Sequence, residues 1–510
     1  MSPKLLVFNR GEIALRACQA ARGLGVRSVL FVTPPERTSV ATRWADELFE
    51  GPHADAARSF DDLELVQRAI RETGATHVYP GYGFSSEKAA LATAVAAAGA
   101  HFVGPSPDVI ELLGDKLRAC TFAERAGLAL LSLPDLASSP GVAADYPILL
   151  KARAGGGGRG NLRVDDPAAY ASAREQLGAR AQQLFGDSRL LAERFVERAR
   201  HIELQFFGFG EQGVALLGTR DCSLQRNHQK VIEEGPAPAH VRAVVDEAAP
   251  GIRAALSALR YRGAGTLELL WDPARAQLYF LEVNARIQVE HPVTELLIGQ
   301  DLVTWQLREA LGLCGDEPVA ALEGVPAGQG AGAHAAQPSA HATPVAQAGR
   351  AGLAGHAIEA RLYAEDPSAG FLPAVGQLTR LDLPRLPFCR WDAGVTQGDT
   401  LTAHYDPMIA KLIVSGATRA EAFARLRLAL DHTHVQGVRT NLAFLRALAS
   451  DERVLADEHD TGFIERERPG MGAPAEPDEA LLRDADALLA LLEAPVADSA
   501  PSTWRRGHAR

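Results

Sequence analysis

Short apolar runs alternate with helical patterns over the first hundred residues of the chain. Residues 4–8 (KLLVF) form an apolar run typical of a buried strand, and an alanine-rich helical stretch follows to about Arg22. The alternation continues with strand patterns at 28–32 and 77–79 and helical patterns at 63–73 and 86–98. Strands that alternate with helices predict a doubly wound α/β domain over residues 1–113.

The pattern becomes mixed between residues 114 and 317. A helical start precedes a predicted strand at 146–151, which leads directly into the glycine-rich stretch 155–160 (GGGGRG). Two apolar runs, at 267–271 and 278–284, are separated by a short polar stretch that contains Asp-Pro. This spacing predicts a β-hairpin.

Composition then separates the central region from a third folded part. Residues 326–352 are rich in Ala, Gly, Pro and His and carry almost no charge. Such a stretch cannot bury much surface, so we expect a flexible insertion over 318–353. A third folded region is predicted over 354–466, and the tail 467–510, with one helical pattern at 479–492, is expected to be an appendage.

Composition and charge narrow the class of protein. The 510 residues contain 52 Lys and Arg against 63 Asp and Glu, a net charge of −11, which argues against nucleic acid as the main partner. The five cysteines are widely scattered and form no metal-binding pair, which is typical of a cytoplasmic protein. No apolar run approaches the length of about 18 residues that a membrane helix needs, so no membrane contact is expected.

The predicted hairpin carries candidate metal ligands. Glu282 and Asn284 share one face of the second strand because side chains alternate along a strand, and Glu268 can meet that face from the first strand. Two carboxylates and an amide oxygen suit Mg²⁺ or Mn²⁺ that carries nucleotide phosphates. The alternative is an amphipathic strand with solvent-facing polar residues. Two glutamates among apolar residues favour the metal.

Three further segments could carry chemistry. Arg286, Gln288 and Glu290 alternate, so an extended segment would let them hold a small oxyanion and remove a proton from it, although a surface loop is the commoner meaning of such spacing. The glycine run could bring backbone N–H groups to phosphates, but it lacks the Lys-Ser/Thr of a Walker A loop and could be a linker. Cys222 and His228 could form a nucleophile–base pair, but a buried structural cysteine is the better interpretation.

Taken together and in order, the motifs resemble those of biotin carboxylase, the ATP-grasp component of biotin-dependent carboxylases. The resemblance covers about residues 3–465. The segments that carry it are 9–14 (NRGEIA), 80–84 (PGYGF), 114–116 (GDK), 151–160, 220–230 (RDCSLQRNHQK), 261–266 (YRGAGT), 282–294 (EVNARIQVEHPVT), 355–367 (GHAIEARLYAEDP) and 405–413 (YDPMIAKLI).

The resemblance implies an N-terminal doubly wound α/β domain, a central ATP-grasp fold with a mobile lid subdomain, and a C-terminal biotin carboxylase domain, a mixture of α/β and α+β parts. In the family, ATP activates bicarbonate as carboxyphosphate, which delivers CO₂ to N1′ of biotin. By the same resemblance Glu268, Glu282 and Asn284 hold Mg²⁺ or Mn²⁺. The catalytic residues that it implies are Lys230, Arg286, Arg361 and Glu290, with Glu290 as the base.

The resemblance also implies residues that bind ATP, bicarbonate and biotin. Gln288 and Val289 match the bicarbonate pocket, Tyr82 lies beside biotin, and Arg361 stabilises the biotin enolate. The nucleotide-binding positions are Lys116, Lys151, Gly156, Gly157, Glu193, His201, Gln225, His228 and Leu270.

Partners follow from what the chain lacks and from the family. The family attaches biotin to a lysine between two methionines, and no methionine of this chain flanks a lysine. We therefore expect a separate biotin carboxyl carrier protein, a separate carboxyltransferase of an acyl-CoA carboxylase in fatty acid metabolism, and a homodimer. Two alternatives stay open. One is another ATP-grasp ligase similar to carbamoyl-phosphate synthetase. The other is a catalytically silent scaffold, an alternative supported by the departures from the family pattern at Asn161 and Arg194.

Overall fold

The protein is represented by a computed structural model that describes residues 2–133, 146–153, 160–316, 318–323 and 355–467. Residues Met1–Gly472 form one compact unit. Glycines 155–158, the expected insertion at 326–352 and the helical pattern at 479–492 lie outside the described residues.

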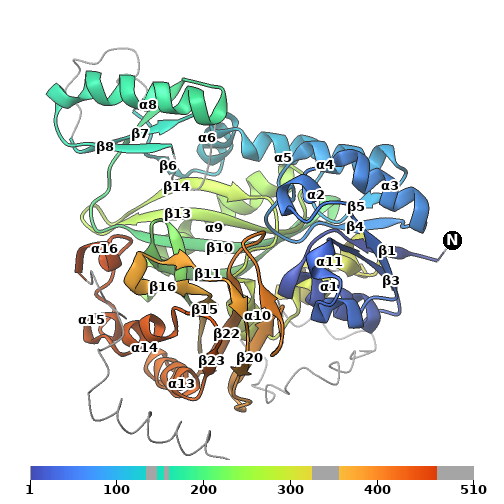
Figure 1. The fold of residues 1–510 in the computed structure, drawn as a ribbon. Helices are drawn as coiled ribbons and strands as arrows, with labels where there is room; N and C mark the ends of the chain where they lie inside the picture. Colours follow the sequence, from blue (N-terminus) through green and yellow to red (C-terminus); the bar gives the residue numbers. More distant parts are fainter. Residues whose placement is uncertain (1, 134–145, 154–159, 317, 324–354, 468–510) are drawn as a thin grey trace, which may run out of the picture. The chain divides into compact units, whose positions relative to one another are not determined.

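The N-terminal region is built on a parallel sheet with strand order β3-β2-β1-β4-β5 (Figure 1). This confirms the predicted doubly wound arrangement. The strands are β1 (Lys4–Val7), β2 (Arg27–Val32), β3 (Glu47–Glu50), β4 (His77–Tyr79) and β5 (His101–Phe102), and the helices are α1 (Gly11–Gly23), α2 (Ala56–Phe60), α3 (Leu63–Thr73), α4 (Ala89–Ala97) and α5 (Pro107–Gly114).

Alternation along β1 explains why helices cover both faces of this sheet. Leu5 and Val7 pack with α1 residues such as Ile13, whereas Leu6 packs with α3 and α4 residues on the other face. Each strand is thus buried on both sides, which is what a continuous apolar run such as KLLVF requires.

Two predicted boundaries in the first half of the chain differ from the structure. Helix α4 begins at Ala89 rather than at Ser86, because residues 83–88 form turns in which Ser86 N–H donates to Gly83 and Lys88 N–H donates to Ser85. The strand predicted at 146–151 is β7 (Ile148–Ala152), which begins after Pro147, a residue without a backbone donor.

The central and C-terminal regions share one large sheet, with strand order β20-β22-β15-β12-β11-β10-β13-β14-β6. Its neighbours are antiparallel except for the β14–β6 pair. The strands are β6 (Ala129–Leu130), β10 (Arg200–Phe209), β11 (Val214–Arg226), β12 (Gln229–Gly235), β13 (Arg262–Asp272), β14 (Gln277–Asn284), β15 (His356–Tyr363), β20 (Cys389–Ala393) and β22 (Met408–Gly416).

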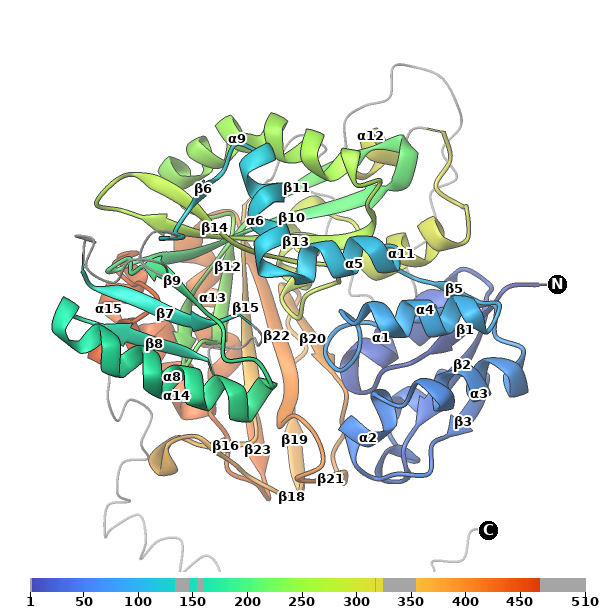
Figure 2. The same ribbon diagram turned by 90° about the horizontal axis from the view of Figure 1, so that it is seen from above.

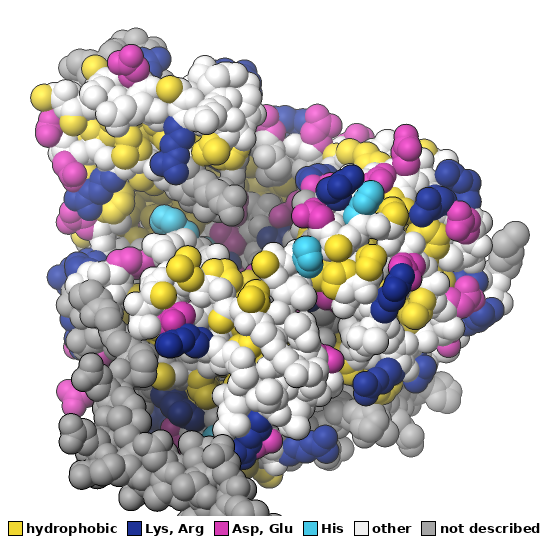
Figure 3. All heavy atoms as spheres, viewed as in Figure 1, with side chains coloured by type: hydrophobic (Ala, Val, Ile, Leu, Met, Phe, Trp, Pro, Cys, Tyr) yellow, Lys and Arg dark blue, Asp and Glu magenta, His cyan; other side chains and the backbone are white. Residues whose placement is uncertain are grey.

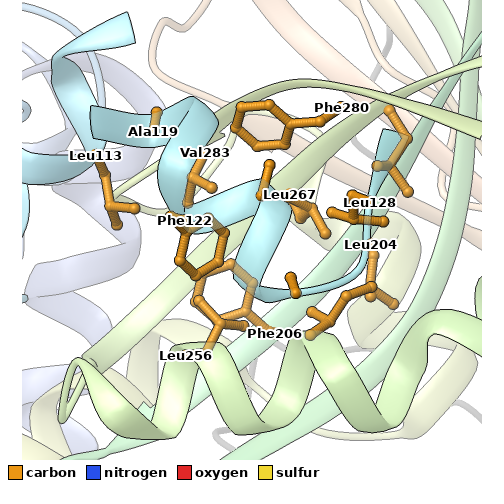
Figure 4. Close-up of a cluster of buried hydrophobic side chains, with 14 of the residues drawn as sticks. Leu113, Ala119, Phe122, Leu128, Leu204, Phe206, Leu256, Leu267, Phe280 and Val283 are labelled. Carbon is orange, nitrogen blue, oxygen red and sulfur yellow. The ribbon is translucent and has the colours of Figure 1, made fainter. Parts of the chain in front are cut away.

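Helices α6 (Lys116–Arg125) and α9 (Ala239–Ala258) cover one part of this sheet around a core of large apolar side chains. Phe122 of α6 and Leu256 of α9 meet strand residues Phe206, Leu267 and Phe280 (Figure 4). Figure 2 shows α9 lying along the strands β10 and β11. The remaining central helices are α10 (His291–Ile298), α11 (Leu302–Ala310) and α12 (Pro318–Glu323). Helix α12 corrects the start of the flexible insertion expected at 318–353, because Leu322 is buried in a core cluster and Glu323 accepts a hydrogen bond from Arg253.

The C-terminal helices complete a second core on the same sheet. Helices α13 (Arg419–Asp431) and α14 (Leu442–Ser450) pack on β15 and β22, and the cluster extends to Leu224 and Ile232 of the central strands. Short elements surround it: α15 (Glu452–Leu455), α16 (Phe463–Glu467), and the paired strands β16 (Glu365–Asp366) with β17 (Leu372–Pro373), β18 (Gly376–Gln377) with β21 (Thr400–Leu401), and β19 (Arg380–Asp382) with β23 (His434–Gln436).

A separate small sheet, order β8-β7-β9, carries helix α8 (Tyr170–Phe185) on a core of its own. Its other strands are β8 (Asn161–Val164) and β9 (Leu190–Arg194). The glycine run joins β7 to β8, so this unit holds the expected lid. Single 3₁₀ turns occur at Pro34–Glu36, Val40–Arg43, Pro167–Ala169, Gly210–Gln212 and Pro367–Ala369.

Two further properties concern the helices and the surface. Among the described helices, none combines the length and the apolar character needed to cross a bilayer. On the face in Figure 3, basic and acidic side chains are interspersed.

Candidate active site

The predicted hairpin exists and brings the candidate metal ligands together. Strands β13 and β14 pair so that Glu268 lies directly opposite Glu282 and Thr266 opposite Asn284. The Asn284 amide donates to Glu268 Oε1 at 2.8 Å. The neighbouring Glu268 carboxylate raises the pKa of Glu282 to about 7. A divalent cation would relieve this like-charge repulsion, and the oxygen donors suit Mg²⁺, so the residues fit the metal.

Lys230 is the centre of the charged network. Its Nζ donates to Glu268 at 3.0 Å and to Glu290 at 2.7 Å, and it also contacts Glu203. Burial opposes the charge of this lysine, but the three carboxylates hold its pKa well above the ordinary value. Arg220, fully buried, pairs with the other Glu203 oxygen at 2.7 Å. Lys230 is therefore a fixed cation among three anions.

The segment after β14 contradicts one expectation. Residues 285–290 form a loop that turns into α10 with Glu290 at its N-cap, so Arg286, Gln288 and Glu290 do not project together from an extended strand. Hydrogen bonds link the side chains of this loop to the hairpin instead. Arg286 donates to Gln288 Oε1 at 3.0 Å, and Gln288 donates to Glu268 Oε1 at 3.2 Å.

Arg361 on β15 joins the C-terminal region to Glu290. Its guanidinium donates to Glu233 Oε1 at 2.5 Å and to Glu290 Oε2 at 2.9 Å. Glu290 is fully buried, yet Lys230 and Arg361 hold its pKa well below the ordinary value. Ionised Glu290 is thus ready to accept a proton once an anionic substrate enters and competes for its two cations.

Tyr82 connects the N-terminal region to the same place. Its hydroxyl donates to Glu12, and Glu12 pairs with the fully buried Lys411 of β22 at 2.9 Å. Lys411 also donates to the backbone carbonyl of Val289 at 2.8 Å. One chain of contacts therefore links the PGYGF loop, strand β22 and the loop that carries Glu290.

The residues predicted to bind nucleotide lie on several elements. Lys151 of β7 pairs with Glu193 of β9 at 2.5 Å, and Lys116 donates to the Ala152 carbonyl at 2.7 Å. Burial, and then the charge of Lys151, lowers the pKa of Lys116. Both lysines thus gather at the small sheet. Gly156 and Gly157 lie outside the described residues.

The remaining nucleotide positions lie on or beside β10, β11 and β13. His201 Nε2 lies 3.2 Å from Glu268, and although burial lowers its pKa, that carboxylate leaves it raised overall. Gln225 is buried near the end of β11, Leu270 is half-buried on β13, and His228 is exposed in the β11–β12 turn with φ of 63°.

Cys222 and His228 form no nucleophile–base pair in the structure. Cys222 is fully buried in β11, and burial raises the pKa of its thiol well above the ordinary value, whereas His228 lies in the exposed turn. The interpretation of a buried structural cysteine is confirmed.

Several residues of the network were not found from the sequence. Glu87, just before α4, pairs with Arg286 at 2.8 Å. The others are Glu12, Glu203, Glu233 and Lys411. A detectable signal existed for some of them: Glu203 and Lys411 are single charges inside apolar strand runs, which is unusual unless the charge is paired in the interior.

Comparison with protein families divides the chain in three. Residues 1–110 match "Biotin carboxylase, N-terminal domain" and residues 359–466 match "Biotin carboxylase C-terminal domain". Residues 136–316 match "Carbamoyl-phosphate synthase L chain, ATP binding domain". The match to the carbamoyl-phosphate synthase model lies in the central region.

Individual relatives cover most of the chain. Biotin carboxylase of Halalkalibacterium halodurans is 38% identical over 473 residues, which span 91% of this chain and 97% of that protein. The α subunit of mitochondrial methylcrotonoyl-CoA carboxylase from Oryza sativa is also 38% identical, but the chain spans only 60% of its length.

Solved structures share the fold. The biotin carboxylase domain dimer of Hydrogenobacter thermophilus 2-oxoglutarate carboxylase, in complex with MgADP, ADP and bicarbonate, is 33% identical with a TM-score of 0.80, over 93% of this chain and all of that one. A biotin carboxylase–ATP complex from Campylobacter jejuni is 30% identical with a TM-score of 0.79, over 92% of this chain and 99% of that one.

The charged network of the large sheet and the similarity over nearly the whole chain lead to one assignment. The chain belongs to the biotin carboxylase family of ATP-dependent ligases, which carboxylate biotin with bicarbonate as the first half-reaction of a biotin-dependent carboxylase.

Proposed function

We propose that this chain carboxylates biotin on a separate carrier protein, with Glu290 as the base for bicarbonate. The observation that carries the proposal is the convergence of Lys230 and Arg361 on the buried Glu290 carboxylate. This arrangement keeps the base ionised while providing two cations for an incoming anion. Both properties are needed to bind bicarbonate and remove its proton.

The residues divide the reaction between them. Arg286, Gln288, Val289 and Lys230 hold bicarbonate, and Glu290 takes its proton so that the oxyanion can attack the γ-phosphate of ATP. Glu268, Glu282 and Asn284 would hold Mg²⁺, or Mn²⁺ in its place, which neutralises phosphate charge. Arg361 stabilises the negative charge that develops on the ureido oxygen of biotin, with Tyr82 beside the ring.

ATP is held by residues of the small sheet and of the large sheet. The proposed contacts of the phosphates are Lys116, Lys151 and the glycines 156 and 157. The proposed contacts of the rest of the nucleotide are Glu193, His201, Gln225, His228 and Leu270.

The proposal extends to organisation and partners. We place the N-terminal domain at 1–113, the ATP-grasp domain at 114–317, an insertion at 318–353 that begins with the packed helix α12, the C-terminal domain at 354–466 and an appendage at 467–510. The chain would act as a homodimer with a carrier and a carboxyltransferase of an acyl-CoA carboxylase, in the cytoplasm and in fatty acid metabolism. The dimer of the Hydrogenobacter domain and the scattered cysteines support these assignments.

The deciding experiment measures phosphate release from ATP with bicarbonate, free biotin and Mg²⁺. We expect release that requires bicarbonate and rises with biotin, and Glu290→Gln should lower it by about 10²–10⁴. Glu421→Gln is a matched control, because Glu421 pairs with Arg425 on α13 at 2.6 Å, outside the network described here. Folded wild-type protein that releases no phosphate above the blank would leave the silent scaffold as the better assignment.

A further inference from the structure

Two buried glutamates outside the proposed catalytic set face each other beside Arg361. Glu233 of β12 and Glu359 of β15 are directly opposite in an antiparallel pair, so their side chains lie on the same face of the sheet. Both are completely buried. Arg361, two residues along β15, lies on that face as well and donates to Glu233 Oε1.

Three of the four carboxyl oxygens in this pair have no hydrogen-bond partner. Glu359 has none on either oxygen, and Glu233 has none on Oε2. Two ionised carboxylates placed opposite each other in the interior would repel strongly and would leave these lone pairs unpaired. One proton held between them removes a charge and supplies the missing donor.

The cationic side chains around Glu359 donate their hydrogen bonds to other groups. The groups that face Glu359 are Glu233 on β12, Arg361 on its own strand, Lys411 on β22 and Glu290 on the catalytic loop. Arg361 donates to Glu233 and Glu290, and Lys411 donates to Glu12 and the Val289 carbonyl. In agreement with this geometry, burial raises the pKa of Glu359 well above its ordinary value, even though Lys411 opposes the rise.

We propose that Glu359 is a positioning residue that shares one proton with Glu233 and so limits the pair to a single negative charge beside Arg361. With one charge on the pair and one on Glu290, the guanidinium is shared between the two sides. A second charge on the pair would draw it towards Glu233 and away from the place where biotin is deprotonated. The inference rests on the proposed role of Arg361 towards biotin.

The proposal gives a pH dependence with a definite sign. Raising the pH removes the shared proton to solvent, adds a negative charge beside Arg361 and lowers the yield of carboxybiotin per phosphate released. Glu359→Gln keeps the size, the neutral charge and a donor, so the yield at neutral pH should stay near that of the wild type and should no longer fall at alkaline pH. Glu359→Leu removes the donor, and we expect the yield to fall about tenfold while phosphate release persists.

A purely structural role would give different results. Both variants would then lower carboxybiotin and phosphate in equal proportion to the folded fraction, and the alkaline decline in yield would remain in Glu359→Gln. That outcome would overturn the proposal. Glu421→Gln, measured in parallel, shows how much a neutral amide at an unrelated glutamate changes either output.

Infrared difference spectroscopy tests the shared proton without any turnover. At about pH 8 ordinary carboxyls are ionised, so the spectrum of wild type minus Glu359→Gln should contain the C=O band of a protonated carboxyl. Absence of this band refutes the shared proton whatever the enzyme does. If the band is present but no phosphate is released with biotin, the proposed function fails and the protonated pair stands.

Discussion

Two neighbouring glutamates on β12 face opposite sides of the sheet and illustrate two uses of a buried charge. Glu234 accepts from Arg419 at 2.6 and 2.9 Å and contacts His356 at 2.7 Å, so both of its oxygens are paired. Glu233 has an arginine on one oxygen and nothing on the other.

The pKa values of the two carboxyls differ accordingly. Burial penalises both charges, but hydrogen bonds from His356 and Arg419 lower the pKa of Glu234 to about 2. Burial and the nearby Glu290 raise the pKa of Glu233 to about 7, even with Arg361 beside it. Full pairing makes Glu234 a structural anchor. Glu233 instead shares its one arginine with Glu290, so Arg361 lies between two anions.

The largest effects should come from removing the two ends of the Arg361–Glu290 contact. Glu290→Gln removes the base and should lower bicarbonate-dependent ATP cleavage by about 10²–10⁴. Arg361→Ser removes the stabilisation of biotin's developing charge and should lower carboxybiotin formation by about 10²–10³ while sparing part of the ATP cleavage. Phosphate and carboxybiotin are measured side by side. Equal loss of both outputs in Arg361→Ser would contradict the separation of roles.

A smaller but still large effect is expected at the metal ligands. Glu282→Gln keeps the size of the side chain but removes one of two anionic ligands, so turnover at ordinary Mg²⁺ should be lost and should return in part at high Mg²⁺. The measurement is phosphate release as a function of Mg²⁺ concentration. Wild-type Mg²⁺ dependence in this variant would remove Glu282 from the site.

Sequence patterns predicted the parts of this site that are local. Alternation along a strand placed Glu282 and Asn284 on one face, and the hairpin brought Glu268 opposite. The contact of Lys230 with Glu203 and Glu290 joins β12, β10 and the loop before α10, and no spacing along the chain encodes it. The family resemblance supplied Arg361, but the carboxylates that orient it depend on strand pairing across the sheet.

The fold shows the same division between local and long-range information. Strands β1, β2 and β4 and helix α3 follow from apolar runs and helical periodicity, which are properties of single segments, whereas the short strands β3 and β5 were not predicted. Composition predicted a boundary between the central and C-terminal regions at 318–353. In the structure, however, β15 of the C-terminal region pairs with β12 of the central region. Composition changes between segments, whereas sheet membership depends on pairing partners that are distant in the chain.

The smallest effect on turnover, and a clear effect on stability, is expected from Glu234→Gln. The variant removes the carboxylate charge that pairs with Arg419 at 2.6 Å, although Asp457 stays 3.9 Å from the same guanidinium, and loss of one partner of a buried pair costs about 3–5 kcal/mol of unfolding free energy. Turnover per folded molecule should change less than about twofold, because Glu234 faces away from Arg361. Denaturant unfolding and activity of the soluble fraction measure the two quantities.

The pH dependence of this loss separates Glu234 from other causes of instability. The folded pKa is about 2 and the ordinary value is 4.5, so the carboxylate contributes fully above about pH 4.5 and its contribution disappears as the pH falls towards 2. The shift corresponds to about 3 kcal/mol, similar to the cost of losing the pair. The unfolding free energies of wild type and variant should therefore differ most near neutral pH and converge in acid. A constant difference from neutral pH down to about 2 would show that packing, rather than the charge of Glu234, accounts for the loss.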